Sequence, residues 1–461
     1  MPLPFVSVVI VNYNGKHFLE ACLDALRSQT YPAEFFEVIV SDNGSTDGSV
    51  EFLRSFYPWV KVIENESNLG FAGGNNIAFR AAQGEYLVLL NNDTSPLNDW
   101  LEKLVKAAVE NPSAGIINGH SRLFYDQLEL TLESDTIGPQ PTDSRVLGVM
   151  VSGVESGAKQ GTVQYLNGFY GWEDYSNIHF RWTNGTAVIG VPVPPGTGEW
   201  ALQLKLSAPR LSNIPVHTQL KLGNVVIAEW DVCGLMPEIY QVNMPEGTYN
   251  QAKPLIQNAG SIVNQDGYGK DRGTYALNNE MFFEEDHAQY KSGSIFAACG
   301  ANVLLKRAML DEIGALDDHF FMYYEDTDLS WRARLYGWEI IYSNDAIIRH
   351  IHCGSSKEWS PSFLFHTSRN RLAMLMKNGS FRQVYRNWGR YFFSTLRITL
   401  GLLKAILLRD KARRPIWNAL KIQYKTIFSL VLWLPILLWQ RVIIRRNSRV
   451  KPIEIDRWLV I

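Results

Sequence analysis

Two kinds of apolar segment alternate through residues 5–120. Short runs such as VSVVIVN, FEVIVSD and EYLVLL are apolar on both faces, whereas HFLEACLDALRSQ repeats its apolar residues at helical spacing. Further helices are predicted at about 45–56, 75–83 and 98–110. Strands of this kind, separated by helices, predict an α/β domain with a mostly parallel sheet that helices cover on both sides.

The pattern changes near residue 126 and returns after about residue 255. Between these points strand-like segments alternate with Pro/Gly turns, which predicts an antiparallel β-sandwich inserted into the α/β domain. We therefore predict four parts: one half of the α/β domain at 1–125, the sandwich at 126–255, the other half at 256–380, and a helical, membrane-associating tail at 381–461.

Charge separates this tail from the rest of the chain. The net charge is −2, but residues 369–451 hold 19 Lys/Arg and one acid, Asp410, which leaves the remainder at −20. A basic, apolar tail on an acidic body predicts binding to an anionic membrane surface. Its most apolar run, 427–439, has 13 residues, and spanning needs about 20. We therefore expect this run to lie in the interface; a helical cap packed on the catalytic core is the alternative.

Composition and cysteine usage narrow the class of protein. With 461 residues, 46% apolar and 20% charged, the chain is predicted to be globular, with two or three domains. The four cysteines lie far apart without a CxxC pair, which favours a reducing cytosol over a disulfide framework or a zinc knuckle. The N-terminus reads as a first strand instead of a signal peptide. We expect a cytoplasmic protein, peripherally associated with the inner face of the plasma membrane, and no nucleic-acid partner.

Polar residues follow the predicted strands, at the edge where such sheets bind ligands. Asn12 and Tyr13 follow the first strand, where an amide and a ring can face a nucleotide base, although a polar turn explains them equally well. Asp42 ends the next strand and can accept hydrogen bonds from a ribose hydroxyl or a base N–H. Asp93 follows EYLVLLNN, and its carboxylate suits Mg²⁺ or Mn²⁺ held jointly with a diphosphate.

A Gly-rich segment, NLGFAGGNN, begins at Asn68 and opens a predicted helix. The missing side chain of Gly70 would let the backbone approach a diphosphate, which a helix N-terminus favours electrostatically. The segment matches neither the Walker pattern nor the dinucleotide fingerprint. A P-loop NTPase or a dehydrogenase is therefore disfavoured.

Two further groups of residues complete the candidate site. Glu325, Asp326 and Asp328 stand in the first turn of a predicted helix. Three acids in four residues exceed what the helix dipole needs, and a partly desolvated carboxylate makes a usable base. Arg332 is expected to pair with Asp328. His350 is near the end of AIIRHIH, and a neutral imidazole there can bind Mn²⁺.

The order and spacing of these motifs resemble the inverting glycosyltransferases of family 2, with a GT-A fold, and most of all their rhamnosyltransferase-type and galactofuranosyltransferase-type members. The matching segments are VVIVNYNG, SDNGSTDGS, NLGFAGGNN, GEYLVLLNND, FMYYEDTDLSWRARLYGW, IIRH and HTSRNRL. They cover roughly residues 5–120 and 260–380. One departure is Asn91, which stands where the family's DxD motif has its first acid.

The resemblance implies roles for individual residues. The nucleotide-sugar donor would contact a set that comprises Asn12, Tyr13, Asp42, Asn68, Gly70, Asn75 and Asn92. Asp93 and His350 would bind Mg²⁺ or Mn²⁺, and Asp326 would be the catalytic base with Glu325 beside it.

The sequence therefore predicts transfer of a sugar, with rhamnose as the first choice, from a dTDP- or UDP-sugar. The acceptor would be a glycan or a polyprenyl-linked acceptor used in cell-surface polysaccharide synthesis. Two alternatives stay open. A sugar nucleotidyltransferase would need a basic, Gly-rich loop after the first strand, where this chain has NYNGKHF. A non-catalytic glycan-binding or scaffold protein would explain the sandwich and Asn91.

Overall fold

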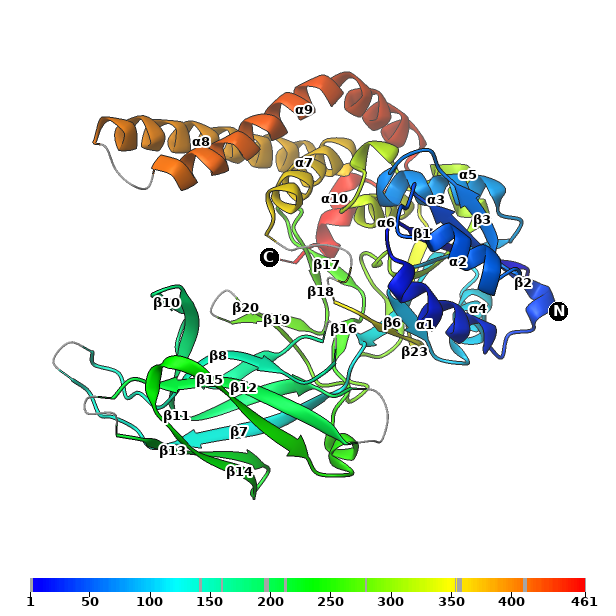
Figure 1. The fold of residues 1–461 in the computed structure, drawn as a ribbon. Coiled ribbons are helices and arrows are strands. Elements are labelled where there is room, and N and C mark those ends of the chain that lie inside the picture. Colours follow the sequence, from blue (N-terminus) through cyan, green and yellow to red (C-terminus); the bar gives the residue numbers. More distant parts are fainter. Residues whose placement is uncertain are drawn as a thin grey trace.

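The computed structural model combines an α/β body, an antiparallel β lobe and a long helical arm (Figure 1). The residues described are 3–140, 143–158, 161–194, 199–210, 214–277, 280–352, 354, 359–408 and 413–460. Asp410 and Cys353 lie outside them. Among the described cysteines, Cys22, Cys233 and Cys299 are free.

The body is built on a sheet with the strand order β21-β23-β6-β22-β4-β1-β2-β3. Neighbours β1/β2, β1/β4, β2/β3 and β6/β23 are parallel, whereas β22 is antiparallel to both β4 and β6. The expected mostly parallel sheet is therefore confirmed. In chain order its strands are β1 (Val6–Asn12), β2 (Phe36–Asp42), β3 (Lys61–Glu64), β4 (Tyr86–Leu90), β5 (Thr94–Pro96), β6 (Ala114–Leu123), β16 (Ile256–Asn258), β21 (Gly293–Ser294), β22 (Asn302–Lys306) and β23 (Glu339–His350).

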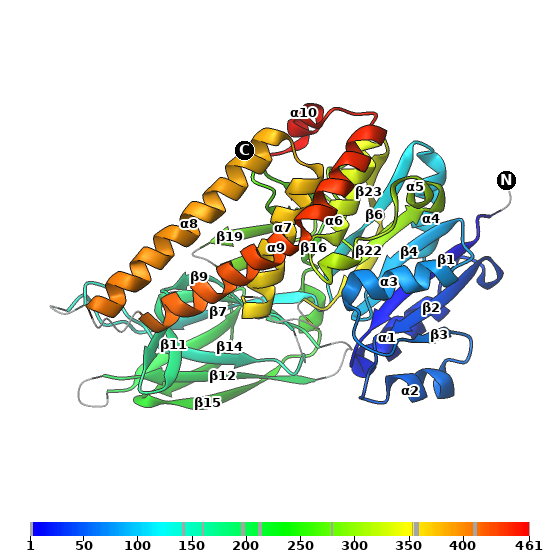
Figure 2. The same ribbon diagram turned by 90° about the horizontal axis from the view of Figure 1, so that it is seen from above.

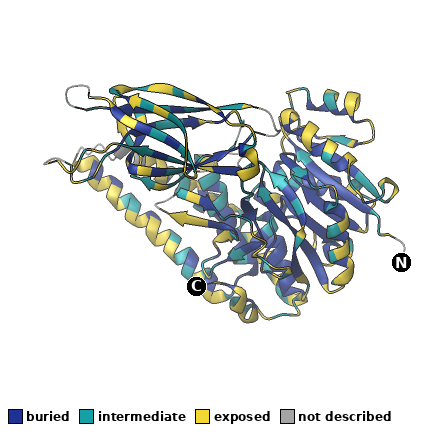
Figure 3. Cartoon of the chain, turned by 90° about the horizontal axis from the view of Figure 1, so that it is seen from below, coloured by how far each residue is buried: buried dark blue, intermediate teal, exposed yellow. Residues whose placement is uncertain are grey.

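Two apolar cores lie on the two faces of this sheet, because its central strands are apolar on both sides. One core packs the sheet against α1 (Lys16–Arg27), α2 (Ser49–Phe56) and α4 (Trp100–Glu110). The other packs it against α3 (Gly70–Ala81), α5 (Arg307–Ile313), α6 (Glu325–Leu335) and α7 (Pro361–Asn378). The burial colouring in Figure 3 shows the sheet as the dark interior between these layers.

Three helix starts differ from the sequence prediction. Helix α2 begins at Ser49 instead of about residue 45, because Gly48 before it has a left-handed φ of 80°. Helix α3 begins at Gly70, five residues before the predicted start, so the Gly-rich segment forms its first turns. Helix α4 begins at Trp100, two residues late. Polar side chains near a helix start can hydrogen-bond to the backbone in place of a helical turn. The spacing of apolar residues does not show which of the two forms.

The inserted lobe is antiparallel, as expected. Its strands form a continuous sheet in the order β14-β13-β7-β11-β8-β12-β15, with β9 and β10 on β11. The first and last strands of this order come into contact around an apolar core, so the sheet curls on itself. The strands are β7 (Gln127–Ser134), β8 (Met150–Glu155), β9 (Gln164–Phe169), β10 (Glu173–Tyr175), β11 (Ile178–Pro192), β12 (Trp200–Ala208), β13 (Val216–Leu222), β14 (Val225–Val232) and β15 (Gly234–Met244).

The lobe is tied to the body at its base. The backbones of Gln127 and Lys253 exchange hydrogen bonds of 2.9 and 2.8 Å, which join the entering and leaving segments. Two hairpins follow, β17 (Ser261–Val263) with β18 (Gly269–Asp271) and β19 (Thr274–Leu277) with β20 (Glu280–Phe283). The ion pair Arg181–Glu280, at 3.1 Å, joins the second hairpin back to the lobe. The predicted boundaries at residues 125, 255 and 380 stay predictions.

The C-terminal arm consists of α8 (Phe381–Leu407) and α9 (Arg413–Asn447), followed by α10 (Pro452–Ile455). The two long helices project from the body, and α9 returns to pack on α7 (Figure 2). An 18-residue window within Ile416–Asn447 of α9 has a mean hydropathy of 2.0, and by length and composition this helix could cross a membrane. Its face toward α7 buries Leu430 and Leu437, whereas Phe428 and Trp439 are exposed.

A buried ion-pair network joins the arm to α6. The Lys377 side chain of α7 is 2% exposed, and its Nζ donates to Asp317 at 2.6 Å and to Asp328 at 3.0 Å. Arg332 also pairs with Asp328, at 2.9 Å, as expected from their spacing. From α9, Gln440 donates to Asp317 at 3.0 Å. Burial alone would raise the pKa of the Asp317 carboxyl, but the charge of Lys377 and its hydrogen bonds lower that pKa overall.

Replacing Lys377 should therefore destabilise the fold. Lys377→Met keeps the aliphatic stem but leaves two buried carboxylates without their shared cation, which should lower the free energy of unfolding by about 3–5 kcal/mol. Urea unfolding followed by circular dichroism measures the change. Lys103→Met is the control, because its 3.9 Å ion pair with Asp99 is exposed, and a change within about 0.5 kcal/mol is expected. Equal effects of the two substitutions would contradict this account.

Candidate active site

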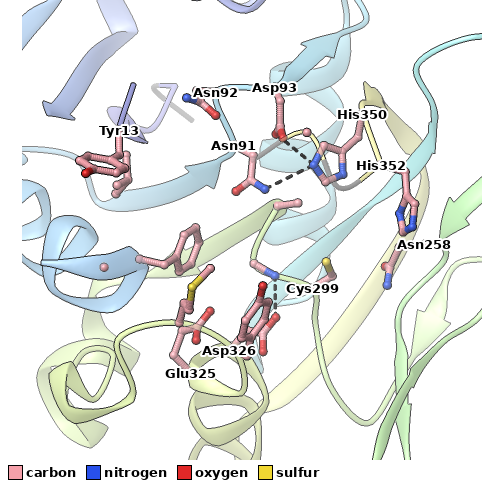
Figure 4. Close-up of a pocket in the computed structure, with 18 of the residues that line it drawn as sticks. Tyr13, Asn91, Asn92, Asp93, Asn258, Cys299, Glu325, Asp326, His350 and His352 are labelled. Carbon is pink, nitrogen blue, oxygen red and sulfur yellow. Dashed lines mark hydrogen bonds and ion pairs between the residues drawn. The ribbon is translucent and has the colours of Figure 1, made fainter. Parts of the chain in front are cut away.

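A cavity of about 540 Å³ opens at the carboxyl ends of the parallel strands, where sheets of this kind bind ligands. Its wall includes Tyr13 after β1, Asn91–Asp93 after β4, and Glu325 and Asp326 at the start of α6. Figure 4 shows Asp93 and His350 on one side of the cavity, with Glu325 and Asp326 on the other. Residues more than 300 positions apart in the chain therefore share one site.

Strand pairing brings Asp93 and His350 together. β23 ends at His350, which lies opposite Thr94 of β5, directly after Asp93. His350 Nε2 lies 3.0 Å from Asp93 Oδ1 and 3.4 Å from Asn91 Nδ2. Asn91, in the place of the family's first acid, thus lies close to the imidazole.

This group fits a divalent cation that a substrate helps to hold. Among the described residues, no three His, Cys, Asp or Glu side chains are grouped as a complete metal site. Asp93 and His350 nevertheless offer the oxygen and nitrogen ligands that Mn²⁺ accepts, and Mg²⁺ sites often use one or two carboxylates plus substrate phosphates. No Lys or Arg lies on the described wall of the cavity. A bound diphosphate would therefore find no protein cation to balance its charge there.

At the cavity wall, Glu325 of α6 is buried and Asp326 is partly buried. Burial raises the pKa of both Glu325 and Asp326, and the charge of Asp326 raises the Glu325 pKa further. Asp326 Oδ2 accepts from the backbone N–H of Gly300 at 2.9 Å, and Oδ1 accepts from the N–H of Thr327 at 2.6 Å. Glu325 Oε2 is buried and has no hydrogen-bond partner among the described residues. Asp326 is thus fixed in orientation, whereas Glu325 keeps one oxygen available.

The segment before α6 is held in an unusual conformation. Phe321, Tyr323 and Tyr324 have φ of 65°, 70° and 72°, a region that is costly for residues with a side chain. Asn370 of α7 offsets this cost, because its Nδ2 donates to the carbonyls of residues 320, 322 and 323 at 2.8–2.9 Å. The HTSRNRL motif therefore supports the cavity wall from behind.

Gly70, the first residue of α3, contacts this segment. Its φ is +71°, and a Cβ atom there would lie 2.3 Å from the carbonyl oxygen of Phe321. Glycine is thus required where α3 and the segment before α6 touch. Asn68 and Asn92 also line the cavity, as does Tyr13, which is 49% exposed.

Three of the residues predicted to contact the nucleotide do not lie on the described cavity wall. Asp42 is 1% exposed, and its oxygens accept from Asn12 Nδ2 and from the N–H of Ser45, both at 2.8 Å. Asn12 in turn accepts from Asn92 at 2.8 Å. Asn75 donates to the carbonyl of Phe71, which lines the cavity. Asn12 therefore holds Asn92 of the wall and Asp42 holds Asn12, while the contacts of Asn12, Asp42 and Asn75 with a nucleotide stay predictions.

The structure also brings in residues that the sequence motifs did not indicate. Ser121 of β6, Gln257 and Asn258 of β16, and Asp271 of β18 all line the cavity. Cys299 and Gly300, before β22, lie on the wall beside Asp326. No spacing signal in the sequence marks them, because their approach depends on how the chain returns from the inserted lobe.

Comparison with known proteins agrees with this geometry. Residues 7–151 match the family model "Glycosyl transferase family 2", and residues 245–444 match "Glycosyl transferase family group 2". The chain is 35% identical over 126 residues to glycosyltransferase AglE of Haloferax volcanii, which is 27% of this chain and 41% of that protein. It is 36% identical over 112 residues to poly(ribitol-phosphate) beta-glucosyltransferase of Bacillus spizizenii, which is 23% of this chain and 18% of that protein.

A third relative is the putative teichuronic acid biosynthesis glycosyltransferase TuaG of Bacillus subtilis. It is 31% identical over 126 residues, which is 27% of this chain and 49% of TuaG. The chain thus aligns with less than two thirds of the length of each of these relatives.

Two solved structures show looser likeness. GalNAc-T7 with UDP, GalNAc and Mn²⁺ gives a TM-score of 0.45 at 12% identity, over 87% of this chain and 52% of that one. The mannosyltransferase PcManGT of Pyrobaculum calidifontis gives 0.39 at 14% identity, over 94% of this chain and 88% of that one.

The expected fold class rests on the sheet and on the family matches. The parallel strands β1, β2 and β4, with the cavity at their carboxyl ends, lie within the first matched region. The second region covers α6, β23, α7 and most of the arm. The two matched regions therefore carry the sequence features of glycosyltransferase family 2 and of glycosyltransferase family group 2, on a GT-A-type fold.

Proposed function

We propose that the chain is an inverting glycosyltransferase that moves a sugar from a nucleoside-diphosphate donor to a hydroxyl of its acceptor. One observation carries the proposal: Glu325 and Asp326, two acids with raised pKa values, share a cavity with Asp93 and His350, and no Lys or Arg lies on the described part of its wall. Such a cavity suits a base on one side and a diphosphate leaving group on the other. A dTDP- or UDP-sugar is the proposed donor class, with rhamnose as the first sugar to test.

In the proposed reaction Asp326 accepts the proton of the acceptor hydroxyl. The oxygen then bonds to the anomeric carbon while the bond from that carbon to the diphosphate oxygen breaks, which inverts the configuration. Hydrogen bonds from Gly300 and Thr327 hold the Asp326 carboxylate in one orientation. Phe71, Phe321 and Phe363 line the same cavity and give it an apolar portion. A divalent ion held by Asp93 and His350 would supply charge neutralisation for the departing diphosphate.

The biological setting is proposed from the relatives and from the arm. TuaG and the ribitol-phosphate glucosyltransferase bear names that concern cell-surface polymers, which supports polysaccharide synthesis as the process. We propose a glycan or a polyprenyl-linked acceptor at the cytoplasmic face of the membrane. Helix α8 exposes four apolar side chains, Phe392, Phe393, Leu396 and Leu400. The neighbouring basic residues Arg390 and Arg397 are exposed as well. This combination suits an anionic lipid surface.

The two alternatives have less support. A sugar nucleotidyltransferase binds a nucleoside triphosphate and needs cationic side chains to offset its negative charge. No Lys or Arg lies on the described cavity wall. A non-catalytic scaffold has no need for the buried Glu325, whose Oε2 has no hydrogen-bond partner among the described residues, because an unsatisfied buried acid reduces stability.

Replacing the base should abolish transfer and spare donor binding. Asp326→Asn should lower kcat by about 10²–10⁴-fold, while the donor dissociation constant from calorimetry stays the same. Because burial raises the pKa of Asp326, wild-type activity should fall as pH decreases through a value above the usual aspartate range, when the base becomes protonated. Glu325→Gln is the matched control and should keep most turnover. If the control loses turnover and Asp326→Asn does not, Glu325 is the base.

Removal of divalent ions should stop the reaction. EDTA is expected to abolish transfer, and added Mn²⁺ or Mg²⁺ should restore it. In calorimetric titrations with Mn²⁺ and UDP, Asp93→Asn and His350→Gln should each weaken binding by at least about tenfold. Asp99→Asn, an exposed position in α4's N-terminal region, should not. Full activity in EDTA would rule out a metal role for Asp93 and His350.

The arm should bind anionic vesicles through α8. Phe392 and Phe393 are 60% and 69% exposed, and the double substitution Phe392→Ser/Phe393→Ser should reduce co-sedimentation with phosphatidylglycerol vesicles by at least about tenfold. Transfer to a soluble acceptor should be unchanged. Phe56→Ser, at a 65% exposed site in α2, is the control and should bind as the wild type does. Equal binding by the wild type and the double variant would argue against the arm as the membrane contact.

A further inference from the structure

One part of the cavity wall has no role in the steps above. It consists of Ser121 at the end of β6, Gln257 and Asn258 of β16, and Asp271 at the end of β18. β16 pairs with β6 at the place where the chain returns from the inserted lobe. The chemistry of these side chains indicates what kind of group can occupy the space in front of them.

Asp271 presents one oriented, unpaired oxygen. Its Oδ1 accepts from Asn258 Nδ2 at 2.7 Å and from Ser261 Oγ at 3.0 Å, whereas Oδ2 receives no hydrogen bond from any described residue. Burial raises the pKa of Asp271 to about 6, and the nearby charge of Asp326 contributes to the increase. The carboxylate is therefore fixed by two neutral donors with its second oxygen left for a ligand.

Gln257 supplies a second, independent acceptor. The residue is 8% exposed, and its Nε2 lies 3.4 Å from His352 Nδ1. Its Oε1 is buried without a hydrogen-bond partner among the described residues. An unsatisfied buried carbonyl is costly and therefore rare in folded proteins. A hydrogen-bond donor from a ligand in the cavity would satisfy it.

The charges on the wall limit what the ligand can be. Asp271, Glu325 and Asp326 all line the cavity, and no Lys or Arg lies on its described wall. Among the described residues of the wall, a phosphate or carboxylate in this part of the cavity would face these acids without a Lys or Arg as counter-charge. A group that offers several O–H donors and no negative charge would instead satisfy Asp271 and Gln257 together.

We propose that Asp271 and Gln257 form the acceptor subsite, and that they bind hydroxyls of a neutral sugar at the end of the acceptor. The inference rests on the glycosyl transfer proposed above and specifies its acceptor class. Asp271 accepts a hydrogen bond from a hydroxyl other than the reacting one, whose proton goes to Asp326. A polyprenyl-linked acceptor is consequently recognised through its terminal sugar, and a bare polyprenyl phosphate or a phosphate-bearing polyol is excluded.

The test compares acceptors and variants of the full-length protein. Initial rates are measured with methyl glycosides of neutral hexoses, with the corresponding uronic acids, and with sugar phosphates. The wild type should use the neutral glycosides. Asp271→Asn and Gln257→Leu should each raise the acceptor KM by about tenfold to a hundredfold, with the donor KM unchanged. Lys270→Ala, at the exposed neighbour of Asp271 in β18, should match the wild type.

A second readout separates recognition from a merely structural role. Because Asp271→Asn removes a negative charge, it should increase the kcat/KM for uronic acids relative to neutral glycosides. Loss of folding would instead reduce the kcat/KM for both kinds of acceptor equally. Preference of the wild type for phosphorylated or uronic acceptors, or an unchanged acceptor KM in both variants, would overturn the subsite.

Hydrolysis of the donor in the absence of acceptor keeps the two proposals distinct. If the wild type hydrolyses donor and the variants keep the wild-type acceptor KM, only the subsite assignment fails. If the wild type neither hydrolyses donor nor transfers its sugar to any acceptor, the proposed function fails, and the subsite falls with it.

Discussion

The catalytic end of the body depends on one buried cation. Lys377 is held between Asp317 and Asp328, and Asp328 stands in the first turn of α6 beside Glu325 and Asp326. Three acids at the start of a helix repel one another, and burial increases that repulsion because the interior screens charge weakly. Lys377 and Arg332 offset the charge of Asp328 alone. Glu325 and Asp326 have no ion pair with a described Lys or Arg, and burial raises the pKa of both.

The same helix that carries Lys377 also shapes the cavity. Asn370, two turns earlier in α7, holds the carbonyls of the strained segment before α6. That segment packs on Gly70. The position of α3 on one side of the cavity therefore depends on the position of the segment before α6 on the other side. Helix α9 packs along α7, and Gln440 of α9 donates a hydrogen bond to Asp317. The arm is therefore connected to the site through direct contacts. A position of the arm at a membrane would therefore fix the orientation of the cavity as well.

The two walls of the cavity have different origins. The proposed donor side comes from the segments that follow β1 and β4 and from α3. These elements all lie within residues 6–93, before the inserted lobe. The other side is assembled from β6, from β16 and β18, which follow the inserted lobe, and from α6. The lobe itself encloses a separate apolar core, and the bonds between Gln127 and Lys253 let the body continue past it almost without interruption. An insertion at this point can thus change the acceptor side while it leaves the donor side intact.

Sequence pattern alone determined the strands β1, β2, β4 and β23 and the placement of Tyr13, Asp93, Asp326 and His350 at one edge, because buried parallel strands carry an unmistakable apolar signature and end at a common edge. It also determined the antiparallel character of the lobe and the Asp328–Arg332 pair. It did not determine that Asp42, Asn12 and Asn75 lie off the described cavity wall, since the same strand-end position can orient a side chain toward a ligand or toward a neighbouring loop. Gln257 and Asp271 line the cavity together with residues of distant segments, and Lys377 reaches Asp317 and Asp328 only through contacts between residues 49 or more positions apart. Such contacts leave no periodic trace in a chain, because they are selected by the packing of whole elements and by the cost of burying unpaired charge.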